Sequence, residues 1–360
     1  MLKDIYFRLI DPQRIIGRIR DGRNDLKSAI DKGTPISIEQ KKEIMNFWHP
    51  YKQSLVERLS FDIRWFDVYN TTNEGHDLKL YIPDSYFYGV VDTFFNDAVR
   101  CKYVDDKNLY DLFFYDVNMP KTICRKEGQV YVDGQYRIIS KESAIKLCKD
   151  NGRVIIKPTI DACAGTGISK WISGKDSDDL LVKKLDESNN LIIQELINQH
   201  ECLAKFNDTC VNTMRIVTLY WDGEIHVVAS VVIMGGEGAL TNHLHGGGLI
   251  CGINSNGKLN PIAVDGALNK YITHPVGGMK FGECSIHNYS KCIDLVKTLA
   301  PRVLGMSKLT AWDLTIDNNG EPLLIEVNLS WGGVVQKAAG PVFGDMTEDI
   351  LRYIKNNKRW

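Results

Sequence analysis

Hydrophobic residues change their spacing along the chain, and the change predicts how the chain is organised. Up to about residue 75, apolar residues such as Ile38, Ile44, Phe47 and Trp48 are scattered among charged ones, which is typical of short amphipathic helices. After Lys102, short apolar runs alternate with helical patterns, and the second half is richer in apolar runs separated by turns. This pattern indicates an α+β fold with a mainly helical N-terminal region.

Turn signals mark several expected elements. Asp133-Gly134 separates two short alternating segments and predicts a hairpin. An apolar run from Leu78 to Asp84 predicts a short strand ahead of an aromatic-rich segment. The second half is expected to contain two covering helices and a final hairpin, namely helices 288–304 and 347–355 and the paired strands 310–316 and 322–328.

Composition narrows the class of protein. At about 150 residues per domain, 360 residues suggest two or three domains, and we expect the segments 1–100, 101–190 and 191–360. Lys and Arg total 44 against 45 Asp and Glu. The net charge is therefore close to zero, and the chain has no overall positive potential that would attract nucleic acid. Nine cysteines without a CxxC pair argue against a disulfide framework and a zinc ribbon. No apolar run approaches the length of a membrane span, and we expect a cytoplasmic protein.

The strongest local signal lies in the last predicted hairpin. Asp313 stands on one strand, and Glu326 and Asn328 stand on the next. Because side chains alternate along a strand, residues 326 and 328 share a face, and Asp313 can lie opposite them. Two carboxylates and an amide supply the hard oxygen ligands that Mg²⁺ prefers. The alternative is a solvated hairpin with ordinary surface carboxylates, which the apolar flanking residues disfavour.

A second signal follows the apolar strand that ends in Lys157. The loop after it, 161–167, contains Gly165, Thr166 and Gly167, and such small residues let backbone N–H groups approach phosphate oxygens. Lys157 would add a positive charge, but neither a Walker nor a Rossmann glycine pattern is present. By itself this loop can equally be only a turn.

Gln194-Glu195-Leu196 follows another apolar strand, with Glu201 a short step further on. This arrangement suits a segment whose backbone recognises adenine and whose carboxylate reaches a ribose hydroxyl, although alone it would be an ordinary strand end.

The ordered set of these motifs resembles the ATP-grasp superfamily, over roughly residues 102–349. The resemblance implies that ATP lies between two α+β subdomains, 101–190 and 191–360, with one or two Mg²⁺ ions. It further implies that Lys107 and Lys157 contact ATP, that Glu195 and Leu196 form the hinge, and that Glu326-x-Asn328 completes the metal site. Asp313 and Glu326 are 13 residues apart, close to the spacing of the D-alanine ligase type.

Further motifs are similar to particular ATP-grasp groups. Asn242-His243-Leu244-His245-Gly246-Gly247 resembles an Asn-x-x-x-Gly-Gly element of glutamate-adding ligases, and the segment 212–215 resembles their arginine-bearing strand. D-alanine ligases carry an Arg where this chain has Ala311, so Arg215 is the candidate that steadies the acyl phosphate. Two His in the first motif lack a third zinc ligand at convincing spacing.

The segments Tyr81-Ile82-Pro83-Asp84 and Trp331-Gly332-Gly333 are similar to ATP-grasp proteins associated with sugar transfer and surface polysaccharides. The resemblance therefore implies an ATP-dependent carboxylate-amine ligase in surface-polysaccharide biosynthesis, with catalytic residues Arg215, Lys157 and Asn242. Its partners would be small carboxylates and amines, sugar-linked ones included, and residues 1–100 would select a substrate or bind a partner. The alternatives are a phosphotransferase and a non-catalytic nucleotide-binding partner of a glycosyltransferase. The sequence does not determine the oligomeric state.

Overall fold

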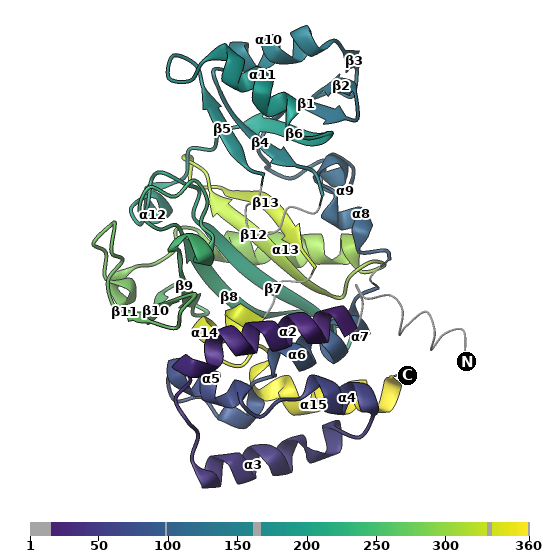
Figure 1. The fold of residues 1–360 in the computed structure, drawn as a ribbon, viewed down its shortest axis with the longest axis vertical. Helices are drawn as coiled ribbons and strands as arrows, with labels where there is room; N and C mark the ends of the chain where they lie inside the picture. The colour runs from purple at the N-terminus through teal and green to yellow at the C-terminus, as the bar shows by residue number, and fades with distance from the viewer. Residues whose placement is uncertain (1–15, 98, 161–166, 330–332, 359–360) are drawn as a thin grey trace.

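The computed structural model describes residues 16–97, 99–160, 167–329 and 333–358. Three regions follow one another along its long axis (Figure 1): a small sheet with two helices, a large sheet backed by a long helix, and a helical region. Within the described ranges no helix has both the length and the apolar character needed to cross a bilayer. The expected α+β fold with a helical N-terminal region is confirmed.

The helical region is built from short helices: α2 (Ile16–Ala29), α3 (Ile38–Trp48), α4 (Leu55–Ser60) and α5 (Trp65–Thr72). Capping boxes begin two of them, because Ser37 pairs with Gln40 at α3 and Ser54 with Glu57 at α4. The shorter elements that follow are η3 (Leu78–Leu80), α6 (Asp84–Tyr86), the π-helix η4 (Phe87–Asp92) and α7 (Thr93–Phe95). The C-terminal helix α15 (Thr347–Asn357) packs into the same core.

The small sheet has six antiparallel strands in the order β3-β2-β1-β6-β4-β5. Helices α10 (Lys141–Asn151) and α11 (Asp178–Asp186) contribute Ala144, Cys148, Leu181 and Leu185 to the core against one face. The strands are β1 (Thr122–Glu127), β2 (Val130–Asp133), β3 (Ile138–Ile139), β4 (Arg153–Pro158), β5 (Ser169–Ile172) and β6 (Asn190–Glu195). The hairpin expected at Asp133-Gly134 is confirmed as the β2–β3 pair.

The large sheet has seven antiparallel strands in the order β11-β10-β9-β8-β7-β12-β13. They are β7 (Thr213–Trp221), β8 (Glu224–Met234), β9 (Leu249–Ile253), β10 (Leu259–Asp265), β11 (Lys270–Tyr271), β12 (Leu309–Ile316) and β13 (Pro322–Asn328). The expected final hairpin is confirmed as β12–β13, and the expected helix 288–304 as α13 (Tyr289–Val303).

The two faces of the large sheet are covered differently. Ile216 and Trp312 pack in the core that contains α13. Val217 and Ala311, whose side chains alternate to the other face, pack in the core of the helical region. The helical region is therefore fixed to the sheet face that also carries Arg215 and Asp313, the next alternate positions along β7 and β12.

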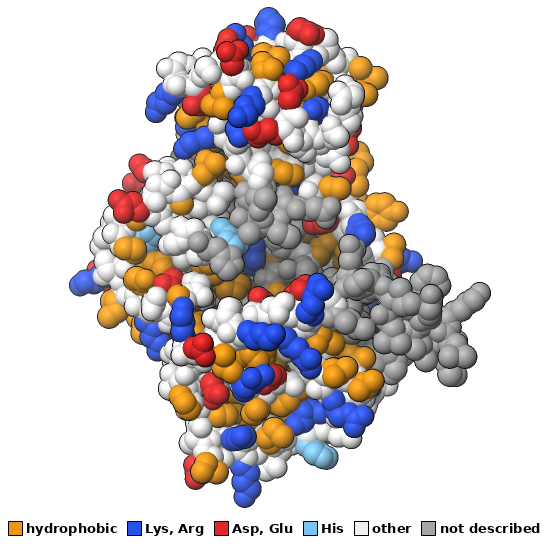
Figure 2. All heavy atoms as spheres, in the orientation of Figure 1, with side chains coloured by type: hydrophobic (Ala, Val, Ile, Leu, Met, Phe, Trp, Pro, Cys, Tyr) orange, Lys and Arg blue, Asp and Glu red, His pale blue; other side chains and the backbone are white. Residues whose placement is uncertain are grey.

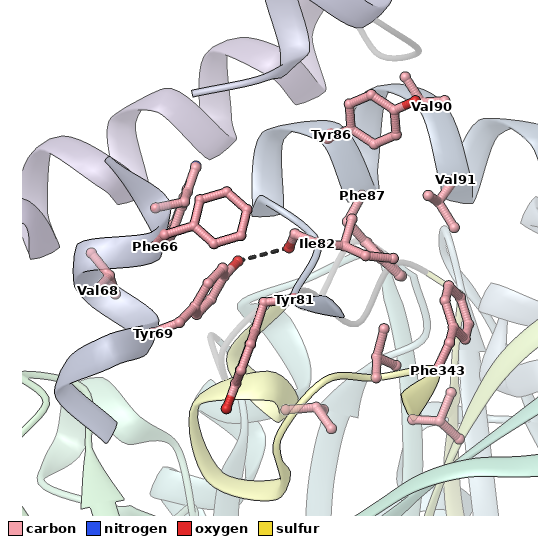
Figure 3. Close-up of a cluster of buried hydrophobic side chains, with 14 of the residues drawn as sticks. Phe66, Val68, Tyr69, Tyr81, Ile82, Tyr86, Phe87, Val90, Val91 and Phe343 are labelled. Atoms are coloured by element: carbon pink, nitrogen blue, oxygen red, sulfur yellow. Dashed lines mark hydrogen bonds between the residues drawn. The ribbon is translucent and has the colours of Figure 1, made fainter. Parts of the chain in front are cut away.

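The strand expected from Leu78 to Asp84 is wrong. A 3-10 turn occupies Leu78–Leu80, and Ile82 pairs with a side chain instead of with a strand. The Ile82 N–H donates to Gln336 Oε1 at 3.0 Å, and Gln336 Nε2 donates to Ile82 O at 2.8 Å. Figure 3 shows the Tyr69 hydroxyl bonded to the same carbonyl, at 2.8 Å, among packed aromatic rings. One amide side chain thus replaces the neighbouring strand.

Replacing Gln336 by Leu should lower the free energy of unfolding by about 2 kcal/mol, because both backbone groups of Ile82 would be left buried without this partner. Urea unfolding of the purified variant measures this loss. Gln129→Leu, at an exposed turn position, is the matched control and should stay within about 0.5 kcal/mol of the wild type. Equal stabilities of the two variants would contradict the role given to Gln336.

Candidate active site

Arg215 and Asp313 form a bidentate ion pair on the face of the large sheet that is turned away from α13. The two residues are directly opposed in the β7–β12 register. Arg215 Nε donates to Asp313 Oδ1 at 2.8 Å, and Nη2 donates to Oδ2 at 2.7 Å. Burial works against the charge, but Asp313 outweighs it and raises the pKa of Arg215. The guanidinium is therefore a fixed positive charge at this point of the sheet.

The three residues expected to bind a metal come together at the β12–β13 hairpin. Asp313 is opposed to Glu326 in register, and Asn328 Nδ2 donates to Asp313 Oδ2 at 2.9 Å. Among the residues that the structure describes, no three His, Cys, Asp or Glu side chains group as a metal site; here the third residue is an amide. The donor set of two carboxylates and one amide oxygen fits Mg²⁺.

Lys107 connects the two sheets. It begins the 3-10 turn η5 (Lys107–Leu109), and its backbone N–H donates to Thr159 O, just beyond β4, at 3.0 Å. Its side chain is almost buried, and Nζ lies 2.8 Å from Glu326 Oε1 on the large sheet. A cation on a turn that is hydrogen-bonded to the end of the small sheet thus pairs with a carboxylate of the large sheet.

Lys157 lies near the end of β4 and faces the same space. Its side chain is buried, and Nζ donates to Gln194 Oε1 at 3.2 Å. Burial lowers the pKa of Lys157 to about 8; the nearby Lys107 charge also lowers it, and Glu326 opposes both. Lys107, Lys157 and Glu326 therefore share one electrostatic environment.

The expected hinge is engaged in backbone contacts. Glu195 exchanges hydrogen bonds with Lys121: its N–H donates to Lys121 O at 3.0 Å, and its Oε1 accepts from Lys121 N at 3.1 Å. The Leu196 N–H donates to Arg153 O at 3.3 Å. Gln194 is the member of this motif that reaches Lys157. Glu201 is exposed at the first turn of α12 (Glu201–Ala204).

Asn242 lies beside the strand that carries Arg215. Its Nδ2 donates to Thr213 Oγ1 at 2.7 Å and to Ile233 O at 3.1 Å. Thr213 and Arg215 are alternate residues of β7, so the Asn242 amide lies on the Arg215 face. Gly167 has φ +78, and a Cβ there would lie 2.7 Å from Pro158 Cγ, so this position favours glycine. Gly165, Thr166, Trp331, Gly332 and the side chain of His245 fall outside the described residues.

Sequence reasoning missed three residues at the site. The Tyr110 hydroxyl accepts a 2.9 Å bond from the Val327 N–H, between Glu326 and Asn328; its i+3 spacing from Lys107 was a usable signal. Tyr88, on the π-helix η4, helps to raise the pKa of Arg215.

Asp84 is the third residue to which the sequence analysis assigned no role at the site, although it ends one of the two motifs that resemble the sugar-transfer group. It is 3% exposed, and a Cβ on Gly333 would lie 1.4 Å from its Oδ1, so the carboxylate rests on the backbone that follows Asn328. Burial raises the pKa of Asp84 to about 6, against the opposing effects of Lys337 and Tyr69. Two motifs that are remote in sequence therefore meet here.

A groove of about 560 Å³ lies elsewhere, on the helical region between α2 and the end of α4. Figure 2 shows Lys and Arg side chains gathered with hydrophobic ones over this region. The lining residues are Ile19, Arg20, Arg23, Asn24, Leu26, Lys27, Leu59, Asp62 and Arg64. None of the residues expected at the site lines this groove.

Comparison with known proteins gives one family. The family model described as "Sugar-transfer associated ATP-grasp" matches residues 91–350. No curated protein sequence matches the chain.

Among solved structures, the chain is similar to D-alanyl-alanine synthetase A from Vibrio cholerae O1 biovar eltor str. N16961, with 12% identity, 71% of this chain and 64% of that chain covered, and a TM-score of 0.41. It is also similar to VanG D-Ala:D-Ser ligase from Enterococcus faecalis, with 16% identity, 72% and 64% coverage and a TM-score of 0.44. A third similar structure is an L-amino acid ligase from Bacillus licheniformis, with 13% identity, 70% of this chain and 48% of that chain covered, and a TM-score of 0.40. The matched region thus spans less than two thirds of each of these enzymes.

Replacing Lys157 by Met should stabilise the protein at pH 7. The pKa of Lys157 is about 8 in the folded chain against about 10.4 for a free lysine, so burying its charge costs about 3 kcal/mol below pH 8. That cost disappears as the pH rises from about 8 to about 10.4, because the unfolded chain then binds more protons than the folded one. Urea unfolding at pH 7 and pH 9.5 should therefore show a gain for Lys157→Met that shrinks at the higher pH.

Lys170→Met, at an exposed position of the neighbouring strand β5, is the control and should show no such pH-dependent gain. A loss of stability for Lys157→Met at pH 7 would contradict the electrostatic account of this lysine.

Proposed function

Because the chain belongs to the sugar-transfer associated ATP-grasp family, we propose that it is an ATP-dependent ligase that joins a carboxylate to an amine. One observation supports this proposal most: three cations, Lys107, Lys157 and Arg215, converge on the Asp313–Glu326 hairpin in the space between the two sheets. A charged set of this kind suits a triphosphate and the charge that develops when a phosphoryl group is transferred.

In this proposal the two lysines hold the phosphates of ATP. Lys157 lies on β4 of the small sheet and Lys107 on the turn η5, and both interact electrostatically with Glu326. A bound phosphate chain adds negative charge beside Lys157, which favours its protonated form. Gln194 keeps the Lys157 ammonium in place through the 3.2 Å bond.

Arg215 would stabilise the reacting groups. An oxygen of the substrate carboxylate attacks the γ-phosphorus, the bond to the ADP oxygen breaks, and an acyl phosphate forms. The amine nitrogen then attacks the acyl carbon and loses a proton, and inorganic phosphate leaves as the amide forms. The planar guanidinium matches carboxylate and phosphate oxygens, and Asn242 lines the neighbouring position on β7. The reaction requires no nucleophilic side chain of the protein.

Asp313, Glu326 and Asn328 would hold Mg²⁺, which when bound offsets phosphate charge. Their present partners are cations, since Arg215 pairs with Asp313 and Lys107 with Glu326. When nucleotide enters, we expect Lys107 to exchange Glu326 for a phosphate oxygen.

We propose that the substrates are carboxylates or amines linked to sugars, because the family is described as associated with sugar transfer, and that the product is used in surface-polysaccharide biosynthesis. We propose that the helical region selects the substrate, since Tyr88 and Asp84 reach the site from it. Because ATP is the substrate, we propose a cytoplasmic location.

The experiment that tests the function is an ADP-release assay over pooled carboxylates, amines and sugars, run beside calorimetric titration with Mg²⁺ and ATP. A ligase releases ADP and phosphate only when an amine is present. A phosphotransferase releases ADP without an amine and leaves a stable phosphorylated product. ATP binding without turnover would instead support a non-catalytic partner of a glycosyltransferase, and no ATP binding at all would reject every one of these functions.

Arg215→Ala should reduce amine-dependent turnover at least about a hundredfold, the usual loss when a group that stabilises transition-state charge is removed. Arg352→Ala, which removes an exposed arginine paired with Glu348 on α15, is the control and should keep full turnover. Steady-state rates with saturating ATP measure the turnover of both variants. Unreduced turnover of Arg215→Ala would show that another group stabilises the transition-state charge.

ATP binding at pH 9 should be accompanied by proton uptake. Lys157 is mostly neutral there in the free protein, because its pKa is about 8, and the phosphate charge would restore the proton. Calorimetry in buffers of different ionisation enthalpy measures the uptake. Lys157→Arg, which stays charged at this pH, should bind ATP without it; equal uptake by both proteins would assign the proton to another group.

A further inference from the structure

A polar cluster lies between the small sheet and the segment that carries Lys107. At its centre is Arg125 of β1, which is 1% exposed. Arg125 is opposed to Ile192, and Ile192 to Lys157, so Arg125 lies on the same sheet face as Lys157, two strands away. With strands about 4.8 Å apart, the two residues are about 10 Å apart along the row. Arg125 Nη2 pairs with Asp111 of α9 (Tyr110–Phe113).

Tyr136 covers this pair from the β2–β3 loop. The Arg125 guanidinium carbon lies 4.3 Å from the centre of the Tyr136 ring. The Tyr136 hydroxyl is 3.1 Å from Asn108 O and 3.3 Å from Asp111 Oδ2. One aromatic side chain therefore contacts β1, η5 and α9 at once.

The backbone of Tyr136 is strained. Its φ is +62, in the left-handed region that bulky residues rarely adopt. Asp133 imposes this turn, because its carboxylate accepts the N–H groups of Gln135 and Arg137 at 2.9 and 3.0 Å. A strained aromatic residue at a hairpin loop requires a compensating role.

Arg125 itself is incompletely satisfied. Within the described part of the chain, its Nε and Nη1 have no hydrogen-bond partner although both are buried. A buried guanidinium with two unpaired N–H groups contributes little to stability, so stability alone does not explain why it is buried here. Arg125 and Tyr136 both contact Asp111, Tyr136 also bonds to Asn108 O, and Asn108 directly follows Lys107.

We infer that Arg125, Asp111 and Tyr136 are positioning residues that fix the turn carrying Lys107 to the small sheet. Asn108 adds to the attachment through its Nδ2 bond to Glu127. A lysine has a long and flexible side chain, so the ammonium can meet a phosphate at low entropic cost only if its backbone is already held. The role of Lys107 toward ATP rests on the proposed function; the attachment of its turn does not.

The test compares two substitutions that relieve the same kind of backbone strain. Tyr136→Gly removes the covering ring, whereas Asp222→Gly changes another left-handed residue, φ +47, at the exposed β7–β8 turn. Hydrogen exchange without nucleotide reports the attachment, and calorimetric titration with Mg²⁺ and ATP reports its consequence. Thermal unfolding of all variants reports global stability.

For Tyr136→Gly we expect faster exchange confined to residues 107–113 and ATP binding weakened about threefold to tenfold, the loss of part of one charged contact. Tyr136→Phe, which keeps the ring but loses the hydroxyl, should give a smaller change in the same direction. Asp222→Gly should leave both quantities as in the wild type.

Unchanged exchange at 107–113 in both Tyr136 variants overturns the inference, as does faster exchange with unchanged ATP affinity. A wild-type protein that binds no ATP rejects the proposed function instead, and the exchange result then decides the attachment alone. If Tyr136→Gly fails to fold, Tyr136→Phe provides the same decision.

Discussion

The Lys107–Glu326 ion pair is the contact that fixes the candidate site. Charged groups taken out of water must be paired closely, and Glu326 meets this requirement with the Lys107 ammonium, from the turn η5, at 2.8 Å. The backbone of Lys107 is hydrogen-bonded to Thr159, just beyond β4, so this residue has a contact on the side of each sheet. Asp313 and Arg215 satisfy each other within the large sheet in the same way. The strands of the β12–β13 hairpin therefore carry two carboxylates, and in the folded protein each of them is paired with a cation.

The helical region covers part of one face of the large sheet, and this arrangement determines where the charged residues Arg215 and Asp313 lie on that face. Alternation along β7 and β12 directs Val217 and Ala311 into the core of the helical region, and Arg215 and Asp313 follow on the same face. The helical region therefore ends where the charged row begins. Its π-helix, an irregularity often found at functional sites, carries Tyr88 to this border. The helical region therefore borders the candidate site and also packs against the large sheet.

Features with local causes could be predicted from the sequence. Two apolar runs separated by a turn predicted the β12–β13 hairpin, and another apolar run predicted the strand that ends near Lys157. Contacts that depend on remote residues could not. Leu78–Asp84 has the composition of a strand, but Gln336, 254 residues from Ile82, takes the place of the pairing strand. Likewise, nothing near Asp84 indicates that it rests on Gly333, and Arg125 gains its importance only from the β1–β6–β4 register.

The bonds between Ile82 and Gln336 also bear on how the protein is made. A ribosome adds about 5 to 20 residues per second, so Ile82 is synthesised many seconds before the glutamine that completes its hydrogen bonding. Ile350, Leu351 and Ile354 of α15 are equally late members of the same core. The helical region, which precedes both sheets along the chain, is therefore among the last to be finished, because its core is complete only once α15 has been translated. Such long-range closure slows folding.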